Sequence, residues 1–268
     1  YGYTLNHNGA LRTYGRTPRD YSTDVYARIA KREIKDAARA KKPFFLNLAP
    51  NAPHTVAVET EAKAEGTPAL PAPRDEAAAA RLEMPIYPNY NEADMSDKAA
   101  LLPFYPQPFG PDVAASLASH YRGRTGSLFA VDDMVASVHR ALVRAGEADN
   151  TVIIFTSDNG WILGEHRLYD WVTQDGNASG VKYVPFEGSS RVPLIIAGPG
   201  FPERKKVRGV TVNADLAPTI LGLARAKGTL PRDGVSLRGA ARHPKRLVGR
   251  GVLIETAPNP RGVPPYKS

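Results

Sequence analysis

Short apolar runs alternate with amphipathic segments along the chain, and this alternation limits the folds that it can adopt. The apolar runs have the length of buried strands, and they cover residues 44–48, 152–156, 193–197 and 252–254. Apolar residues at helical spacing predict helices over residues 23–42, 113–145 and 215–224. Strands separated by helices predict an α/β protein with a mainly parallel or mixed sheet and helices on its faces.

Local signals set the ends of the predicted helices. Ser22 is placed to cap the first helix, since a serine side chain can accept a hydrogen bond from the free amides of the first turn. Gly146 is placed to close the long helix, in which Gly123 and Gly126 favour a bend. The proline-rich residues 55–111 are predicted to be irregular apart from a short helix at 75–81, and so long a loop is usually functional or disordered.

Composition excludes several kinds of site and partner. The chain of 268 residues contains no cysteine, which excludes disulfides, thiolate metal sites and a cysteine nucleophile within it. The net charge of +8 comes from scattered lysines and arginines without a zinc-finger or RNA-recognition pattern, so we expect a solvated basic surface and no nucleic-acid partner. No apolar run approaches the roughly 18–20 residues that span a membrane.

Polar side chains follow two of the predicted strands directly. The run 152–156 leads into TSDNGWILGEHR, which places Asp158 and Asn159 at the end of a strand. Carboxylate and amide oxygens suit Ca²⁺ or Mg²⁺, although Ser-Asp-Asn-Gly is also a good turn sequence and both interpretations stay open. His54 follows the run 44–48, and ligands of open α/β sheets bind at the carboxyl ends of strands. Taken singly, His54 and Lys182 have no context that separates them from surface residues.

Several blocks in one order add a family resemblance that covers nearly the whole chain. The blocks are PFFLNLAPNAPHT, AVDDMV, TSDNGWILGEH, Lys182, PFEGSSRVPLIIAGPG, DLAPTILGLA and DGVSLRG. This ordered set resembles the sulfatases of the alkaline-phosphatase superfamily. The stretches YGYTLNHNG and YNEADMSDKAALL are similar to the N-acetylglucosamine-6-sulfatase branch. The resemblance implies an alkaline-phosphatase-like mixed sheet flanked by helices.

The resemblance also implies roles for individual residues. Asp158 and Asn159 match two ligands of a divalent cation, Ca²⁺ or alternatively Mg²⁺, and His54 matches the residue that protonates the leaving-group oxygen. Lys182 matches a lysine that places a positive charge on a sulfate oxygen. Three further residues are expected to support the site loops or to touch substrate, and they are His166, Glu187 and Arg191.

The family's nucleophile has no counterpart in this chain. Sulfatases use a formylglycine made from the first residue of a Cys/Ser-x-Pro-x-Arg motif, whereas Gly200 and Arg242 occupy that position before the two Pro-x-Arg sequences here. The resemblance therefore implies that residues 1–268 are the C-terminal portion of a catalytic domain, with residues 200–268 as the last part of the match. The formylglycine would lie on the protein's own N-terminal segment, which becomes an expected partner.

The implied activity is removal of sulfate from a sulfated sugar or a related ester, and the family favours a secreted or periplasmic location. A phosphatase or phosphonate-ester hydrolase of the same superfamily is the enzymatic alternative. The presence of Asn159 and Lys182 favours one cation and a sulfate over the two-metal sites of such enzymes. A homologue without a nucleophile that binds sulfated glycans is the third interpretation.

Overall fold

The computed structural model describes residues 1–55, 67–98, 108–171, 178–179, 181–182 and 184–254. The chain forms two compact units, each built from two stretches of sequence. The first unit contains residues 1–148 and 161–181, and the second contains residues 149–160 and 182–268. No helix in the described part of the chain is long and apolar enough to cross a membrane.

The first unit begins with a hairpin of β1 (Tyr3–His7) and β2 (Ala10–Tyr14), which pair antiparallel. Asn8 and Gly9 form the turn with φ values of 53° and 92°, and two positive φ values in a row are typical of the tight turns whose twist matches that of a hairpin. The rings of Tyr3 and Tyr14 stack across the hairpin with centroids 5.0 Å apart. A short 3-10 turn (Pro18–Asp20) connects the hairpin to the first helix.

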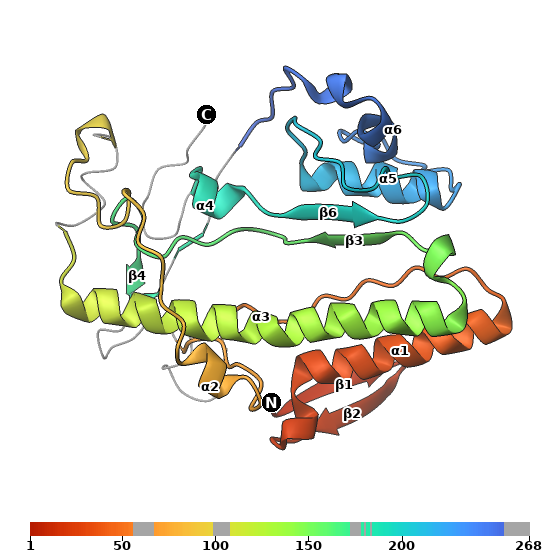
Figure 1. Ribbon diagram of the computed structural model, residues 1–268, viewed down its shortest axis with the longest axis horizontal. Coiled ribbons are helices and arrows are strands. Elements are labelled where there is room, and N and C mark those ends of the chain that lie inside the picture. The colour runs from red at the N-terminus through yellow and green to blue at the C-terminus, as the bar shows by residue number, and fades with distance from the viewer. Residues whose placement is uncertain (56–66, 99–107, 172–177, 180, 183, 255–268) are drawn as a thin grey trace. The chain divides into compact units, whose positions relative to one another are not determined.

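Two long helices, α1 (Ser22–Ala40) and α3 (Pro111–Ala145), pack against each other and form the body of the first unit (Figure 1). The helix α1 buries Val25, Ala30 and Ile34 on one face, as its apolar spacing predicts. It begins at Ser22 and has Tyr21 at the N-cap position, so the prediction that Ser22 caps a helix starting at residue 23 is wrong. The Arg74 guanidinium fastens the two helices, with Nη1 2.7 Å from Asp24 Oδ2 and Nη2 2.9 Å from Asp133 Oδ2.

The helix α3 runs without interruption through Gly123 and Gly126, so these glycines do not end or divide it. Their role is close packing: a Cβ atom on Gly123 would collide with the Ala69 carbonyl oxygen, and one on Gly126 would collide with the Ala79 side chain. Ala79 ends the short helix α2 (Glu76–Ala79), which lies within the predicted range 75–81. Gly146 closes α3 with φ 72°, as predicted.

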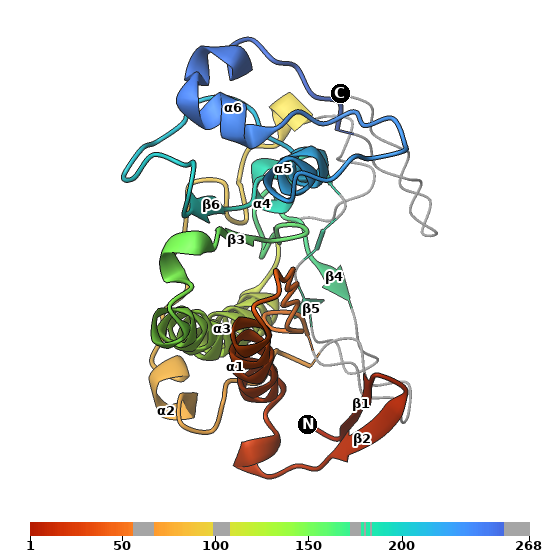
Figure 2. The ribbon, with the colours of Figure 1, turned by 90° about the vertical axis from the view of Figure 1, so that its right-hand side faces the viewer.

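The other described residues of the first unit are mostly irregular around a small aromatic core. Phe109 and Leu117 are buried there, and the Phe109 ring makes edge contacts with Tyr90 and Tyr169 at centroid distances of 5.3 and 5.5 Å. The remaining elements are a 3-10 turn (Ser96–Lys98) and the antiparallel pair β4 (Asp170–Trp171) and β5 (Ala178–Ser179), which Figure 2 shows beside each other.

The second unit is built on β3 (Ile153–Thr156), which pairs antiparallel with β6 (Leu194–Ala197). Its other elements are α4 (Glu187–Ser190), α5 (Leu216–Leu223) and α6 (Leu237–Arg242), with 3-10 turns over Asn213–Asp215 and Pro244–Leu247. A further 3-10 turn (Ala148–Asn150) precedes β3. The predicted strands 152–156 and 193–197 and the predicted helix 215–224 thus form in this unit, as β3, β6 and α5, whereas α4 and α6 were not predicted.

Two predicted strands do not form. Residues 44–48 and 252–254 have no strand hydrogen bonds to another described segment, and Phe45 and Leu253 are 72% and 67% exposed. The reason is that an apolar run becomes a strand only when its backbone can pair with a neighbouring strand. The sequence of the run does not show whether such a neighbour exists. Every pair among the described strands is antiparallel, so the predicted parallel pairing is not seen there.

Candidate active site

The loop after β3 in the second unit is a turn fastened from two sides. The Asn159 backbone amide donates to Asp158 Oδ1 at 2.9 Å, and Ser157 Oγ donates to the Asn159 carbonyl oxygen at 2.8 Å. From a distant part of the chain, Asn213 Nδ2 donates to the carbonyl oxygens of Ser157 and Asp158 at 3.2 and 3.1 Å. These bonds use one oxygen of the exposed Asp158 carboxylate, and no described residue donates to the other. The turn and the site interpretations are therefore compatible.

Lys182 reaches the same loop. Its Nζ lies 3.5 Å from Asn159 Oδ1, while Asn159 Nδ2 donates to the Gly160 carbonyl oxygen at 2.8 Å and so sets which way the amide points. The structure thus brings together three of the predicted site residues, Asp158, Asn159 and Lys182, although 23 positions separate the lysine from the asparagine. A positive charge, an amide oxygen and a carboxylate at one loop can bind an anion and a cation side by side.

The helix α4 supports the loop through its backbone. The Gly160 amide donates to the Ser189 carbonyl oxygen at 2.7 Å, and a Cβ atom on Gly160 would collide with the Gly188 carbonyl oxygen, so the contact requires glycine. Glu187 and Arg191 lie at the two ends of this helix and pair with each other at 2.8 Å, with side chains 78% and 79% exposed. The expected support of the loop therefore comes from the backbone of α4, and a role for these two side chains stays a prediction.

His54 lies in the first unit, on an exposed loop. Its Nδ1 is 3.0 Å from the Thr55 carbonyl oxygen, and because a carbonyl can only accept, Nδ1 carries the hydrogen. This bond leaves Nε2 for other partners. The His54 ring meets Trp161 edge-on with centroids 5.9 Å apart, and the backbone amide of His54 donates to the Asn51 carbonyl oxygen at 2.7 Å.

Trp161 also contacts a half-buried arginine that the sequence did not indicate. The Arg124 guanidinium of α3 lies over the indole ring, with Cζ 4.2 Å from the ring centroid. Burial lowers the pKa of Arg124 to about 10, and Nη1 is buried without a hydrogen-bond partner in the described part of the chain. Arg124, Trp161 and His54 therefore form a contiguous stack within the first unit. The position of a tryptophan directly after the SDNG turn was the available signal for it.

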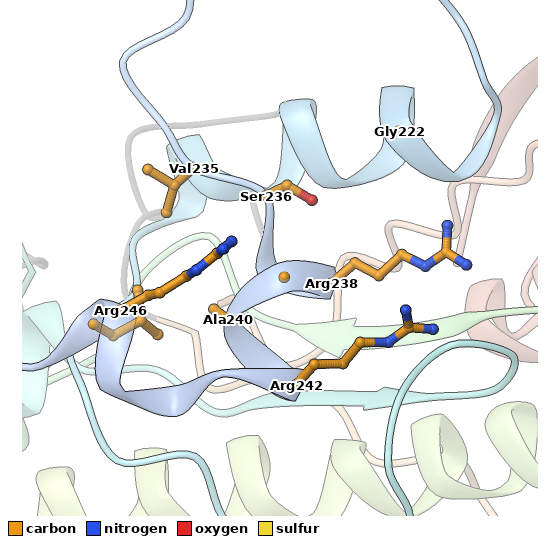
Figure 3. Close-up of a pocket in the computed structure, with 9 residues that line it drawn as sticks. Gly222, Val235, Ser236, Arg238, Ala240, Arg242 and Arg246 are labelled. Atoms are coloured by element: carbon orange, nitrogen blue, oxygen red, sulfur yellow. The ribbon is translucent and has the colours of Figure 1, made fainter.

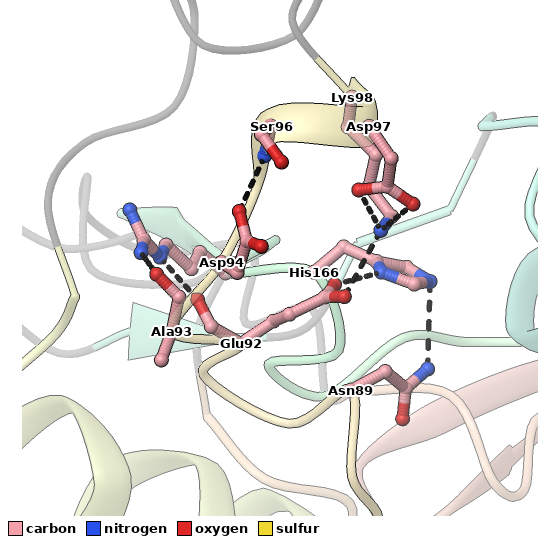
Figure 4. Close-up of polar contacts among 9 residues, drawn as sticks. Asn89, Glu92, Ala93, Asp94, Ser96, Asp97, Lys98 and His166 are labelled. Atoms are coloured by element: carbon pink, nitrogen blue, oxygen red, sulfur yellow. Dashed lines mark hydrogen bonds and ion pairs between the residues drawn. The ribbon is translucent and has the colours of Figure 1, made fainter.

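His166 belongs to a polar network that joins two loops of the first unit (Figure 4). Its Nδ1 lies 2.7 Å from Glu92 Oε2, and Asn89 Nδ2 lies 3.4 Å from its Nε2. Lys98 Nζ binds the other Glu92 oxygen at 3.0 Å. Burial alone would raise the pKa of Glu92, but the bonds from His166 and Lys98 outweigh it and lower that pKa. The network supports the interpretation that His166 orients its loop, which stays a prediction, as does contact with substrate.

The backbone around His166 is held in an unusual conformation. His166 and Arg167 both have positive φ, 54° and 59°, a region that side chains other than glycine occupy rarely. Arg167 stabilises it by donating from Nε to the Glu92 carbonyl oxygen and from Nη2 to the Ala93 carbonyl oxygen, both at 2.7 Å. The Glu165 carboxylate accepts from the Leu163 amide at 2.6 Å. The loop that contains His166 is thus held by hydrogen bonds of Arg167 and Glu165, some of which go to residues distant in sequence.

A comparison with known families shows what kind of chain carries these loops. The family model described as "Sulfatase" matches residues 2–226. The chain belongs to the sulfatase family. The match contains every predicted site residue.

Two curated sulfatases are similar to this chain. It is 35% identical to an arylsulfatase of Volvox carteri, with 84% of this chain and 36% of the relative covered. It is 31% identical to the N-acetylglucosamine-6-sulfatase of Homo sapiens, with 95% of this chain and 42% of the relative covered. This sulfatase chain therefore spans less than half the length of the curated relatives that it matches.

Solved structures confirm the predicted fold class. A protein solved in complex with its substrate D-glucosamine-2-N,6-O-disulfate has a TM-score of 0.64 and 20% identity, over 94% of this chain and 58% of that one. At this identity the similarity concerns the fold, which is that of the alkaline-phosphatase-like sulfatases.

The oxygen atoms of Asp158 and Asn159 suit a hard cation, but they are too few to complete its coordination sphere. Asp158 and Asn159 supply one carboxylate and one amide oxygen, as Ca²⁺ and Mg²⁺ prefer. No group of three His, Cys, Asp or Glu side chains able to hold a metal ion occurs among the residues that the structure describes. The two residues of this sulfatase therefore fit such an ion as part of a larger donor set. Convergence of His54, in the first unit, with Lys182 and the loop of the second stays a prediction.

Proposed function

We propose that the protein containing this chain hydrolyses the sulfate ester of a sulfated sugar, and that this chain supplies the cation- and sulfate-binding side of the site. The observation that supports this most is that Lys182 reaches the loop carrying Asp158 and Asn159 in a sulfatase-family chain. A lysine next to an amide and a carboxylate offers one positive group for an anionic ester and two oxygens for one cation.

In this proposal Asp158 and Asn159 would hold a divalent cation, Ca²⁺ or alternatively Mg²⁺. Such a cation, when bound, polarises the sulfate ester and stabilises negative charge on its oxygens. Asp158 has the oxygen for this role that no described residue engages. Asn159 presents Oδ1 away from its own backbone because its Nδ2 is bonded to the Gly160 carbonyl oxygen.

Lys182 and His54 would act on the ester itself. The Lys182 ammonium binds a sulfate oxygen and stabilises the charge that shifts onto it as the S–O bond breaks. His54, with a hydrogen on both ring nitrogens, donates the Nε2 proton to the departing sugar oxygen, while its Nδ1 hydrogen stays bonded to the Thr55 carbonyl oxygen. The backbone bond from Gly160 to Ser189 holds the loop in place for these steps.

The nucleophile is proposed to be a formylglycine on a segment outside these 268 residues. The chain contains no cysteine, and neither of its Pro-x-Arg sequences follows a serine at the required position. We also propose the sugar as substrate, by analogy with the names of the human relative and of the solved complex. A location outside the cytoplasm remains a prediction from the family.

The test is turnover by the full-length protein with N-acetylglucosamine 6-sulfate, the matching 6-phosphate and a phosphonate monoester. We expect sulfate release to be the fastest of the three, and we expect the 268-residue chain alone to give background rates. Lys182→Ala should lower kcat/KM for the sulfate ester by roughly 10²–10³-fold, the scale for losing one preorganised charged donor. The exposed Lys227→Ala is the matched control. Faster phosphate or phosphonate hydrolysis, or equal effects of both variants, would contradict the proposal.

A further inference from the structure

A cavity of about 640 Å³ lies in the second unit, around the helix α6 (Figure 3). Apart from Gly222, its lining lies beyond residue 226, where the family match ends. The lining residues are Gly222, Val235, Ser236, Arg238, Gly239, Ala240, Arg242, Arg246 and Leu247. We call this cavity the arginine pocket. Its volume is in the range of 300–1,000 Å³ that is typical of sites for small organic ligands.

Three arginines dominate the charge of this pocket. Arg238 and Arg242 are four residues apart on α6, which places them on one face of the helix, and Figure 3 shows both side chains extending in the same direction. Arg246, four positions further on, reaches toward Val235 and Ser236. Like charges four residues apart on a helix repel, so the arrangement is unfavourable unless an anion lies between them.

No carboxylate neutralises these arginines within the described part of the chain. The side chains of Arg238, Arg242 and Arg246 take part in no ion pair or hydrogen bond with the described residues, and all three are exposed. The buried carboxylate of the same unit, Asp215, is bound by Arg250 instead. The pocket therefore presents three guanidinium groups to any anion that enters it.

Two glycines leave room for the guanidinium groups. A Cβ atom on Gly200, which has φ 90°, would lie 2.8 Å from Arg238 Nε, and a Cβ atom on Gly239 would lie 3.1 Å from Arg246 Nη1. Side chains at these two positions would displace both arginines. Beneath them, Ala240 and Leu247 are 3% and 2% exposed and give the pocket a packed floor. The guanidinium groups of Arg238 and Arg246 therefore lie close to the backbone at these two glycines.

We propose that the arginine pocket binds a sulfate-bearing segment of a sugar chain. A guanidinium group offers a planar fork of N–H donors that matches the oxygens of sulfate, and Ser236 offers a hydroxyl for a sugar hydroxyl group. The volume exceeds that of a single tetrahedral anion, given about 30 Å³ for one water molecule. No aromatic residue is among the described residues that line it, which disfavours nucleic acid because single strands bind by stacking bases on aromatic rings.

The binding goes beyond the proposed hydrolysis, since it involves no reaction, and it is measured without turnover. Titration calorimetry of the 268-residue chain in the Lys182→Ala background, at fixed salt, uses a sulfated tetrasaccharide as the probe. The Lys182→Ala background weakens binding at the candidate active site, so that failure of that site and failure of this one are separable. Removing one charge-assisted donor is expected to weaken binding about tenfold, first with Arg242→Gln and independently with Arg246→Gln. Ser236→Ala should weaken it less.

The matched control is Arg208→Gln, an exposed arginine of the same unit that does not line the pocket. We expect this variant to bind as the parent does. Because the pocket arginines are exposed, each single variant should keep the parent's thermal midpoint, and the two serve as independent tests should one unfold. Four results would overturn the proposal: equal affinity for the desulfated tetrasaccharide, equal affinity for an oligonucleotide of the same charge, competition by inorganic sulfate at similar concentration, or an equal loss in Arg208→Gln.

Discussion

Lys182 Nζ and Asn159 Oδ1 lie 3.5 Å apart. The Asn159 amide, which is proposed to bind the metal ion, is therefore already in contact with the Lys182 ammonium, which is proposed to bind sulfate. Two positive charges at one amide oxygen would repel, and a bound anion between them would relieve that repulsion. If the proposed roles of Asn159 and Lys182 hold, we therefore expect metal binding and substrate binding at this loop to be coupled.

Asn159→Leu should weaken calcium binding by the full-length protein at least tenfold. Loss of a residue that merely supports a metal ligand costs 10–100-fold in affinity, and loss of a ligand itself costs no less. Asn213→Ala, which removes the two bonds to the loop carbonyl oxygens, should have a smaller effect in the same direction. Calorimetric titration with Ca²⁺ measures both, and unchanged affinity in Asn159→Leu would remove this residue from the cation site.

His54→Ala should reduce turnover of a sugar sulfate more than turnover of an activated aryl sulfate. General acid catalysis contributes roughly 10²–10⁴-fold where the departing oxygen is a poor leaving group, and that contribution shrinks where the group leaves without a proton. Steady-state kinetics of the full-length protein with both esters gives the two ratios. Equal ratios would show that His54 positions the ester and does not protonate it.

Glu92→Gln should lower the free energy of unfolding by about 1–3 kcal/mol near neutral pH, because His166 and Lys98 lose their charged acceptor. The pKa of Glu92 is lowered in the folded state, so its contribution is present above the ordinary glutamate value of 4.5 and is lost as pH falls through the folded value. The difference between variant and parent should therefore vanish in acid.

The control for Glu92 is Asp97→Asn. Asp97 binds the same lysine at 2.8 Å but is 71% exposed, and an exposed pair contributes at most about 1 kcal/mol. Urea unfolding of both variants across pH 3–7 makes the comparison. A constant gap between Glu92→Gln and the parent over this range would show that the charge of Glu92 is irrelevant to stability.

Asp215→Ala should destabilise the second unit by about 3–5 kcal/mol. The Asp215 carboxylate is fully buried and accepts from Arg250 at 2.6 and 2.9 Å and from the amides of Val212 and Val235 at 3.0 and 2.8 Å. Removing one partner of such a pair leaves the other donors without an acceptor. The exposed Asp233→Ala should change stability by less than about 0.5 kcal/mol.

Urea unfolding of Asp215→Ala and the parent across the acid pH range measures this loss of stability and tests the charge of Asp215. Burial alone would raise the pKa of Asp215, but the bonds from Arg250 and the two amides lower it overall. Its stabilisation is therefore present above the ordinary aspartate value of 3.8 and is lost only as pH falls through a lower folded value. Loss of this stabilisation already at pH 5–6 would contradict the assignment.

The sequence predicted the longer helices well because their determinants are local, whereas it missed the short helices α4 and α6. Apolar spacing and a closing glycine identified α3 to within two residues, since each turn of a helix is stabilised by residues three or four positions away. The runs 44–48 and 252–254 failed as strands for the opposite reason, because pairing depends on a backbone elsewhere. Gly123 and Gly126 were interpreted as favouring a bend, and the sequence did not reveal their close contact with a segment more than 40 positions earlier in the chain.

The candidate site was predictable in its chemistry and less so in its support. Asp158, Asn159 and Lys182 stand out by residue type and order, and the structure places them together. Arg124 and Asn213 were missed because nothing in their local sequence marks them. The first acts through a ring 37 positions away by sequence number, and the second through bonds to carbonyl oxygens 55 and 56 positions away.

The ion pair between Asp215 and Arg250 shows that the family match ends before the residues that stabilise the fold do. The recognisable family signal ends at residue 226, yet the arginine that neutralises a fully buried carboxylate of the family block DLAPT lies 24 positions beyond that end. A protein shortened at the limit of similarity would keep every residue proposed for chemistry and lose the counter-ion of its own interior. The part of the chain that matches the sulfatase family is therefore shorter than the part that stabilises its fold.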